Sequence, residues 1–129
     1  MPNISSRSQD PFLAALTNPT ELAKRKGNLK RSYPLRDKNG RVWADSEAAY
    51  KAFKTGDTPR DEGIMVRIIA AKLQQYPELL RGIEDRGGVA WLEQCSHVVG
   101  VRNSRWEGKG RDSRFIRCLI AAFEVASKT

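Results

Sequence analysis

Two stretches of this chain place apolar residues at the three- and four-residue steps of an amphipathic α-helix, and this periodicity constrains the fold most. The first stretch runs from about Asp61 to Gln75 and has its apolar positions at Ile64, Met65, Ile68, Ile69 and Leu73. The second begins at Asp112 or Ser113 and has them at Ile116, Leu119, Ile120 and Phe123. One face of each predicted helix is therefore expected to lie in the core.

Shorter elements are predicted around these two helices. Asn18-Pro19-Thr20-Glu21 is typical of a helix start, with Asn18 as the N-cap, and this helix should end at Gly27. Asn39-Gly40 lies between two extended pieces and indicates a small β hairpin. The other predicted segments are a loop at 58–61, a short helix from Pro77, an extended piece at 96–101 and a loop at 102–112.

The length of 129 residues suits one domain with a modest core. We predict a mostly α (α+β) fold, with a flexible N-terminal segment at 1–10 and a single compact domain at 11–129 that contains the hairpin. No apolar run approaches the roughly 18 residues of a membrane helix, and the N-terminus lacks a hydrophobic signal region. We therefore expect a cytoplasmic protein that does not bind membranes.

The formal net charge is +8, and the cations are concentrated in two segments. The first contains no acidic residue and carries Lys24, Arg25, Lys26, Lys30, Arg31 and Arg36. The second contains Glu107 and Asp112 beside Arg102, Arg105, Lys109, Arg111, Arg114 and Arg117. Such segments suit a phosphate-bearing ligand, either a nucleotide or a nucleic acid. The alternative is a solvated basic surface that only keeps the protein soluble.

The residues that most often ligate metals are few. Cys95 and Cys118 show no metal-ligand spacing and are expected to be buried or partly buried thiols. His97 is the only histidine, lies in an apolar stretch and is interpreted as structural. A lone histidine excludes a His-rich metal site, and we expect neither a metal nor a cofactor.

The helix predicted to begin at Asp45 or Ser46 brings three reactive side chains to one stripe. Glu47 and Lys54 are seven residues apart, and seven steps of about 100° return to within roughly 20° of the same direction. Tyr50 lies between them on that stripe. A carboxylate, a phenol and an amine on one helix face form a candidate catalytic set. The competing interpretation is a row of solvated helix charges.

Three blocks of the sequence also follow one another as in a known family. They are Gly27-Asn28-Leu29, the segment from Gly40-Arg41-Val42-Trp43 through Glu47 to Lys54, and Trp106-Glu107-Gly108-Lys109-Gly110. In order and spacing they resemble the NADAR superfamily, which includes N-glycosidases of riboflavin-pathway intermediates and ADP-ribosyl-guanine hydrolases. The similarity extends over about residues 27 to 125. It departs at Ala48-Ala49, where the family has His-Tyr, at the additional Glu107, and at Asn103, where the family has a site aspartate.

The resemblance implies cleavage of an N-glycosidic bond at ribose C1 in an ADP-ribosyl or nucleotide-derived phosphorylated substrate. It implies catalytic positions at Glu47, Lys54 and Asn103, with Glu47 stabilising positive charge on the sugar or activating water. Lys54 would act as an amine nucleophile or, more modestly, hold a phosphate. The implied substrate-binding residues are Asn28, Trp43, Tyr50, Arg105, Trp106, Gly108, Lys109, Gly110, Arg111 and Ser113.

Two other functions stay open at this stage. Asn103 and the altered tryptophan loop are compatible with a module that binds a nucleotide or ADP-ribose without turning it over. A small basic nucleic-acid-binding protein is the other alternative, with the two basic segments forming one stripe and a steep salt dependence of binding. An enzyme that acts on ADP-ribosylated nucleic acid would combine a pocket with such a stripe.

Overall fold

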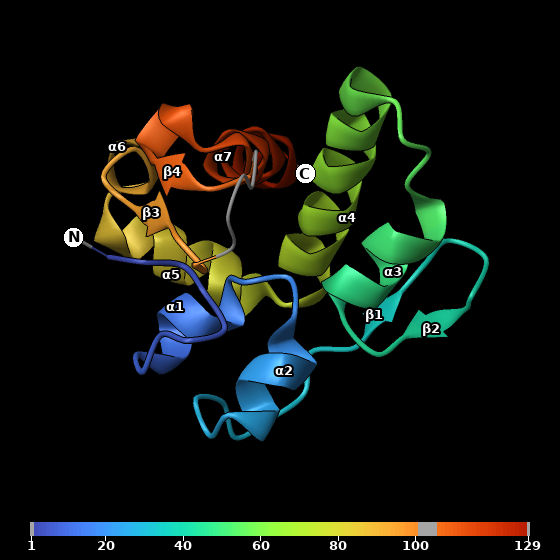
Figure 1. The fold of residues 1–129 in the computed structure, drawn as a ribbon, viewed down its shortest axis with the longest axis horizontal. Helices are drawn as coiled ribbons and strands as arrows, with labels where there is room; N and C mark the ends of the chain where they lie inside the picture. The colour runs from blue at the N-terminus through green and yellow to red at the C-terminus, as the bar shows by residue number, and fades with distance from the viewer. Residues whose placement is uncertain (1, 101–105, 129) are drawn as a thin grey trace.

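The computed structural model of this chain describes residues 2–100 and 106–128 and shows a mostly α fold in a single domain with two small antiparallel hairpins (Figure 1). The helices are α1 (Pro11–Ala15), α2 (Thr20–Arg25), α3 (Ser46–Phe53), α4 (Thr58–Gln75), α5 (Pro77–Arg86), α6 (Val89–Leu92) and α7 (Arg114–Ser127), with a 3₁₀ turn η1 (Gly110–Asp112). The strands are β1 (Leu35–Arg36), β2 (Val42–Trp43), β3 (Ser96–His97) and β4 (Gly108–Lys109). The predicted fold class is confirmed.

The core is built where α4 and α7 cross, as the two apolar stripes predict. Figure 1 shows α7 end-on beside the length of α4. Met65, Ile69 and Leu73 from α4 pack in one cluster with Ile116 and Leu119 from α7. Each of these five side chains is buried, and burial of a large aliphatic side chain contributes about 1.5–3 kcal/mol. Because α3 packs on α4 and Phe115 lies at the start of α7, this crossing positions part of the cleft described below.

The first hairpin forms at the predicted place. β1 and β2 pair antiparallel, with Leu35 opposite Trp43 and Arg36 opposite Val42. The turn is closed by Asp37, whose carboxylate accepts the backbone N–H groups of Asn39 and Arg41. A side chain that bonds its own backbone two residues on is a common turn device.

Residues 2–10 differ from the prediction of a flexible segment, because they pack on the domain. Ile4 is fully buried, and its backbone N–H donates to the Ser96 carbonyl oxygen at 2.8 Å. Asn3 pairs with Ser96 in a β bridge, and its side-chain amide donates to the Val98 carbonyl oxygen. Polar groups of this segment thus find partners at residues 96–98, which are distant in sequence.

Three further boundaries differ from the sequence prediction. α4 begins at Thr58, inside the predicted loop, because the Asp57 carboxylate caps it by accepting the Arg60 N–H. The short α1 follows a cap by Asp10 that the sequence reading did not assign. Part of the predicted loop at 102–112 forms β4 and η1, because β4 pairs antiparallel with β3. Among the described residues, no helix combines the length and apolarity needed to cross a membrane.

Candidate functional site

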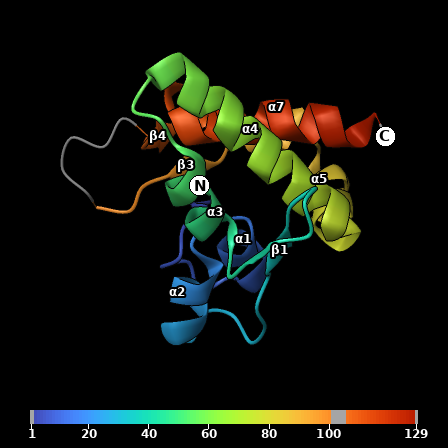
Figure 2. The same ribbon diagram turned by 90° about the vertical axis from the view of Figure 1, so that its right-hand side faces the viewer.

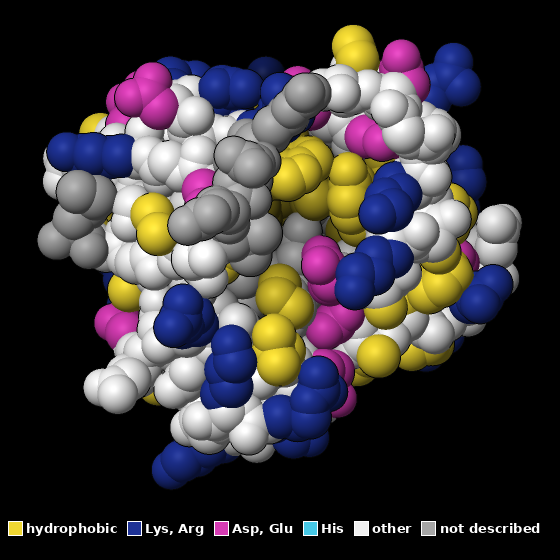
Figure 3. All heavy atoms as spheres, in the orientation of Figure 1, with side chains coloured by type: hydrophobic (Ala, Val, Ile, Leu, Met, Phe, Trp, Pro, Cys, Tyr) yellow, Lys and Arg dark blue, Asp and Glu magenta, His cyan; other side chains and the backbone are white. Residues whose placement is uncertain are grey.

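An open cleft of about 790 Å³ brings Glu47, Tyr50, Lys54 and Trp106 together. One side is formed by α2 with the segment that connects it to α1, and another by α3. The rest of the lining comes from Met65 of α4, Phe115 of α7, His97, Val99 and Trp106. Figure 3 shows the hollow in the middle of this face, with hydrophobic side chains inside it and lysine and arginine side chains around it. Its volume suits a nucleotide-sized ligand.

A single carboxylate holds two walls of the cleft together. Asp45 Oδ1 accepts the Ala48 N–H at 2.9 Å and so caps α3. Its Oδ2 accepts the Glu21 N–H at 3.1 Å in the first turn of α2. The backbone adds a third link, because the Glu47 N–H donates to the Asn18 carbonyl oxygen at 3.3 Å. The unpaired N–H groups at the starts of two helices thereby meet at one place.

Glu47 is the carboxylate of the predicted set that lines the cleft, and it is half-buried. Burial raises the pKa of Glu47 above its usual value, and the neighbouring Asp45 acts in the same direction. The cations of Lys51 and Lys54 oppose this shift in the pKa of Glu47. A partly desolvated carboxylate beside cations is a suitable base or charge stabiliser.

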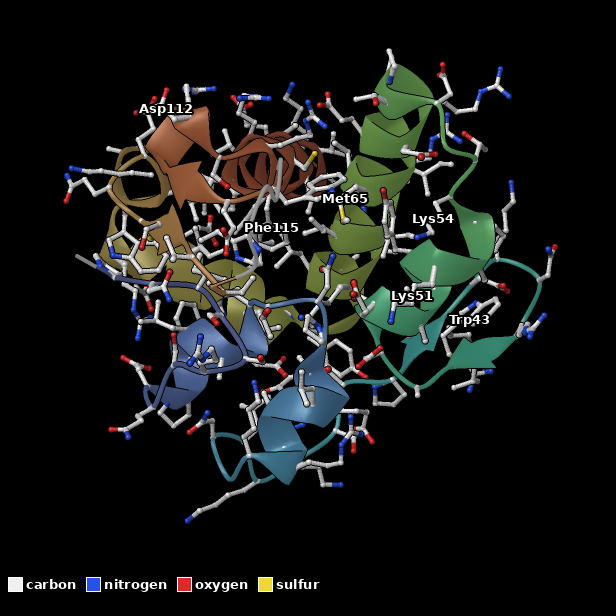
Figure 4. All side chains as sticks on the ribbon, in the orientation of Figure 1. Trp43, Lys51, Lys54, Met65, Asp112 and Phe115 are labelled. Carbon is white, nitrogen blue, oxygen red and sulfur yellow. The ribbon has the colours of Figure 1, made fainter. Side chains whose placement is uncertain are left out.

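The aromatic side of the cleft contains the other predicted residues. Tyr50 and Trp106 both line the cleft and contact each other edge to face, with ring centroids 5.7 Å apart. Phe115 stacks on the His97 ring at 4.4 Å. Met65 and Phe115 extend from facing helices into this region in Figure 4. These surfaces suit the flat face of a base or a sugar.

His97 behaves as a neutral structural side chain that also reaches the cleft. Its Nδ1 lies 2.7 Å from the Ile4 carbonyl oxygen, and only a protonated Nδ1 can donate there. Burial lowers the pKa of His97. The structural interpretation of His97 agrees with this contact, although its place on the cleft wall was not predicted.

Cations surround the mouth of the cleft. Arg25 and Lys26 come from the end of α2, Lys51 and Lys54 from α3, and Arg7 from the N-terminal segment. All five are exposed. Within the described part of the chain, Arg25, Lys51 and Lys54 form no salt bridge, so their charge is available to a phosphate.

The sequence reading missed two polar residues on the cleft wall, Thr17 and Asn18. Asn18 was predicted to cap α2, but the cap position is Pro19, which makes no side-chain hydrogen bond to this helix. Thr17 is fully buried and Asn18 is 4% exposed. Thr17 Oγ1 and Asn18 Oδ1 both lack a hydrogen-bond partner. The sequence offers one signal for Thr17 and Asn18, which is that both are polar and lie between two apolar segments.

Two predicted binding residues lie outside the lining of this cleft. Asn28 Nδ2 donates to the Ser6 carbonyl oxygen at 2.8 Å and so holds the N-terminal segment. Trp43 lies on the hairpin, on the outer side of α3 (Figure 4). Its Nε1 donates to Asp37, and Arg41 and Phe53 pack on its ring. Both side chains contact other parts of the fold, and neither lines this cleft.

The predicted glycine and basic segment after Trp106 is also structural in its described part. Gly108 and Lys109 form β4, and the Gly110 N–H donates to the Cys95 carbonyl oxygen at 2.7 Å. Arg111 Nε is paired with Glu93 at 2.6 Å. The Ser113 hydroxyl donates to the Trp106 carbonyl oxygen and accepts the Ile116 N–H, so it caps α7 rather than binding an anion. Asn103 and Arg105 lie outside the described residues.

Lys54 and Lys72 differ strongly in their exposure to solvent. Lys54 is exposed at the end of α3, so it lacks the desolvation that activates an amine nucleophile. Lys72 on α4 is 2% exposed, and its Nζ donates to the carbonyl oxygens of Ala15 at 2.5 Å and Thr17 at 2.7 Å. Desolvation lowers the pKa of Lys72 to about 7. Lys72 thus supports the cleft from below, and Lys54 suits phosphate binding.

The two basic segments do not form one stripe in the described structure. α2, from the first segment, lies at the bottom of both views, whereas β4 and the start of α7 lie at the top (Figures 1 and 2). Arg114 and Arg117 of the second segment are paired with Glu62. The first segment is the one that contributes cations to the cleft.

Metal ligands do not gather in the described residues, where no three His, Cys, Asp or Glu side chains form a possible metal site. Both cysteines are free and buried, and burial raises the pKa of Cys118 to about 11. No protein-family model, no curated protein and no solved structure matches this chain.

Proposed function

We propose that this protein is an N-glycosidase-type hydrolase that cleaves an N-glycosidic bond at ribose C1 of an ADP-ribosyl or nucleotide-derived phosphorylated substrate. The observation that carries the proposal is the position of Glu47. Its half-buried carboxylate lies in a nucleotide-sized cleft with Tyr50 and Trp106, below a mouth surrounded by cations. The resemblance of the Gly40-to-Lys54 segment to N-glycosidases supports the same reaction.

The reaction makes demands that the cleft residues can meet. As the C1–N bond breaks, its electron pair leaves with the nitrogen, and positive charge develops at C1 and the ring oxygen. The Glu47 carboxylate stabilises that charge. It then accepts a proton from the water that attacks C1 and passes this proton to the leaving nitrogen, which completes the hydrolysis and returns Glu47 to the carboxylate. A raised pKa makes Glu47 a stronger base than an exposed glutamate.

The remaining residues bind the substrate in this proposal. Lys51, Lys54, Arg25 and Lys26 would hold phosphate groups at the mouth, where each is exposed. Trp106 and Tyr50 would pack on a base or sugar ring. A neutral metabolite would leave these cations unused, so a phosphorylated substrate is favoured.

A mass-spectrometric turnover assay tests the proposal. Wild type, Glu47→Gln and the matched control Glu84→Gln would be incubated with ADP-ribosylated guanine in DNA, ADP-ribosylated protein, NAD and ribosylamino-pyrimidine phosphates. Glu84 is exposed on α5 and does not line the cleft. We expect wild type and Glu84→Gln to release a free base, and Glu47→Gln to lose activity by about 10²–10⁴-fold.

The assay also separates the alternatives. Binding of one of these ligands to folded wild type without turnover would replace the enzyme by a non-catalytic nucleotide-binding module. Tight, salt-sensitive binding to unmodified DNA or RNA, with no affinity for free nucleotides, would support a nucleic-acid-binding protein instead.

A further inference from the structure

The cleft has a neutral polar floor that the reaction proposed above does not use. This floor consists of Thr17 and Asn18, which lie between α1 and α2. Both side chains are more than nine-tenths buried, and both line the cleft. Thr17 Oγ1 and Asn18 Oδ1 have no hydrogen-bond partner. An unpaired buried polar atom destabilises the protein, so a ligand that supplies the missing partners would be stabilised there.

The groups offered by the floor define the chemistry of that ligand. Asn18 Oδ1 is a free acceptor, and its Nδ2 donates only to the Met65 sulfur at 2.9 Å. Thioether sulfur is a weak acceptor, so a ligand oxygen or ring nitrogen would be a better partner. An amide side chain that offers one donor and one acceptor side by side pairs with a ligand edge that does the same. Nucleobase edges have this arrangement.

The surroundings of the floor favour a flat heterocycle over a sugar or a phosphate. Met65, Phe115 and Trp106 line the same cleft and offer apolar or aromatic surface. The five cations are exposed at the mouth, whereas Thr17 and Asn18 are buried. Near Thr17 and Asn18 the interior therefore offers neutral polar groups and apolar surface. The carboxylates of Asp45 and Glu47 also line the cleft, and the cations lie at its mouth.

The position of Glu47 fixes where the sugar would lie. Its backbone N–H donates to the Asn18 carbonyl oxygen, so the catalytic helix and the floor are in direct contact. We propose that Thr17 and Asn18 form the subsite for the leaving base, which enters first, with ribose C1 at Glu47 and the phosphates at the mouth. This inference rests on the proposed function for the identity of the ligand.

Lys72 keeps this floor in place. Its Nζ donates to the carbonyl oxygens of Ala15 and Thr17, and Lys72 itself does not line the cleft. The backbone at Ala15 and Thr17 is thus anchored to α4, while Thr17 Oγ1 and Asn18 Oδ1 have no hydrogen-bond partner in the protein. A subsite whose backbone is held in this way needs little ordering when a ligand binds.

Calorimetric binding to fragments tests the subsite without any turnover, using the Glu47→Gln background. The base probes are hypoxanthine, cytosine and nicotinamide, and the sugar probe is ribose 5-phosphate. The variants are Thr17→Val and Asn18→Leu, which keep shape and remove the polar groups. Thr20→Val is the matched control, because Thr20 is equally buried with an unpaired hydroxyl but does not line the cleft.

We expect Thr17→Val and Asn18→Leu each to weaken binding of the tightest base by about tenfold, with ribose 5-phosphate unchanged. Thr20→Val should bind every probe as the parent does. If hypoxanthine is that base, Asn18→Leu should weaken binding of 1-methylhypoxanthine less than binding of hypoxanthine, because the methyl group removes the donor that Asn18 Oδ1 accepts.

Three results would overturn the subsite. These are equal effects of Thr17→Val and Thr20→Val, a loss that falls on ribose 5-phosphate instead of the base, and no binding of any base. Failure of the proposed function looks different, because it is the absence of turnover by wild type. Base binding that depends on Thr17 and Asn18 in a protein without turnover would keep the subsite and reject the hydrolase.

Discussion

The α3 side of the cleft and the segment from Gly108 to Ser113 contain the same kinds of residue, yet the structure uses them differently. Glu47, Lys51 and Lys54 extend from α3 toward the cleft and form no salt bridge within the described residues. Arg111 and Ser113 are instead bonded to Glu93 and to the start of α7. A charged or polar side chain can bind a ligand well only where it is not already paired with another group of the protein.

The largest expected effect tests whether the Gly108-to-Ser113 segment is structural. Gly110 has a positive φ of 53°, and a Cβ there would lie 2.4 Å from the Glu93 carbonyl oxygen. Gly110→Ala should lower the free energy of unfolding by about 3 kcal/mol, because backbone strain and steric overlap add. Gly40→Ala is the control, since Gly40 has a φ of 85° and open space, and should cost about 1 kcal/mol.

Chemical denaturation followed by circular dichroism would measure both variants. A Gly110→Ala protein with wild-type stability and selectively lost turnover would place this segment in the functional site, and the comparison with α3 would fail.

The second prediction concerns the carboxylate that joins α2 and α3. Asp45→Ala removes one cap and one link to a second helix, and we expect a loss of about 2 kcal/mol in the free energy of unfolding. Asp57→Ala removes the cap of α4 alone and should cost about 1 kcal/mol. Denaturation curves of the two variants would give the difference. Equal losses would show that the Asp45 link to Glu21 contributes nothing.

The third prediction is a pH dependence of stability from the lysine beneath the cleft. Burial holds the pKa of Lys72 at about 7 in the folded protein, below the 10.5 of the unfolded chain. Between these values the unfolded state binds more protons, so stability should rise with pH, by at most about 1.4 kcal/mol per pH unit. Lys72→Met should lose this slope. Urea titrations at pH 7, 8 and 9 would compare the two, and parallel profiles would reject the assignment.

The smallest expected effect is on the affinity for ribose 5-phosphate, and it comes from replacing cations in each of the two regions. Lys51→Ala and Lys54→Ala should each weaken binding of ribose 5-phosphate by at most about fivefold, as expected for exposed ion pairs. Lys109→Ala and Arg111→Ala should leave that affinity unchanged. Calorimetry at low and high salt would show the difference, which salt should reduce. A loss confined to the second pair would reverse the roles of the two regions.

Much of the fold follows from local patterns in the sequence. The apolar steps of α4 and α7, the Asn39-Gly40 turn and the start of α3 all appear where they were predicted. The Glu47, Tyr50 and Lys54 stripe also lines one cleft with Trp106. Spacing along one helix is a property of that helix alone, so it needs no knowledge of distant contacts.

The remaining site residues depend on partners that are distant in sequence. In the sequence, Trp43 and Ser113 were predicted to contact a ligand. In the structure, Trp43 donates to Asp37 and Ser113 donates to the Trp106 carbonyl oxygen. Asn18 resembles a helix cap, yet Pro19 takes that position and leaves the amide facing the cleft. No local pattern states which polar group finds a partner, because that depends on how separate elements pack.

The sequence by itself determined the helical core, the first hairpin and the reactive stripe of α3, since each is encoded by spacing within one short segment. Only the tertiary structure decided that Thr17 and Asn18 line the cleft, that Lys72 supports their backbone, and that Asn3 pairs with Ser96. The physical reason is that burial and hydrogen bonding are settled by contacts between segments. A side chain is available to a ligand only if it is not already hydrogen-bonded to another part of the protein.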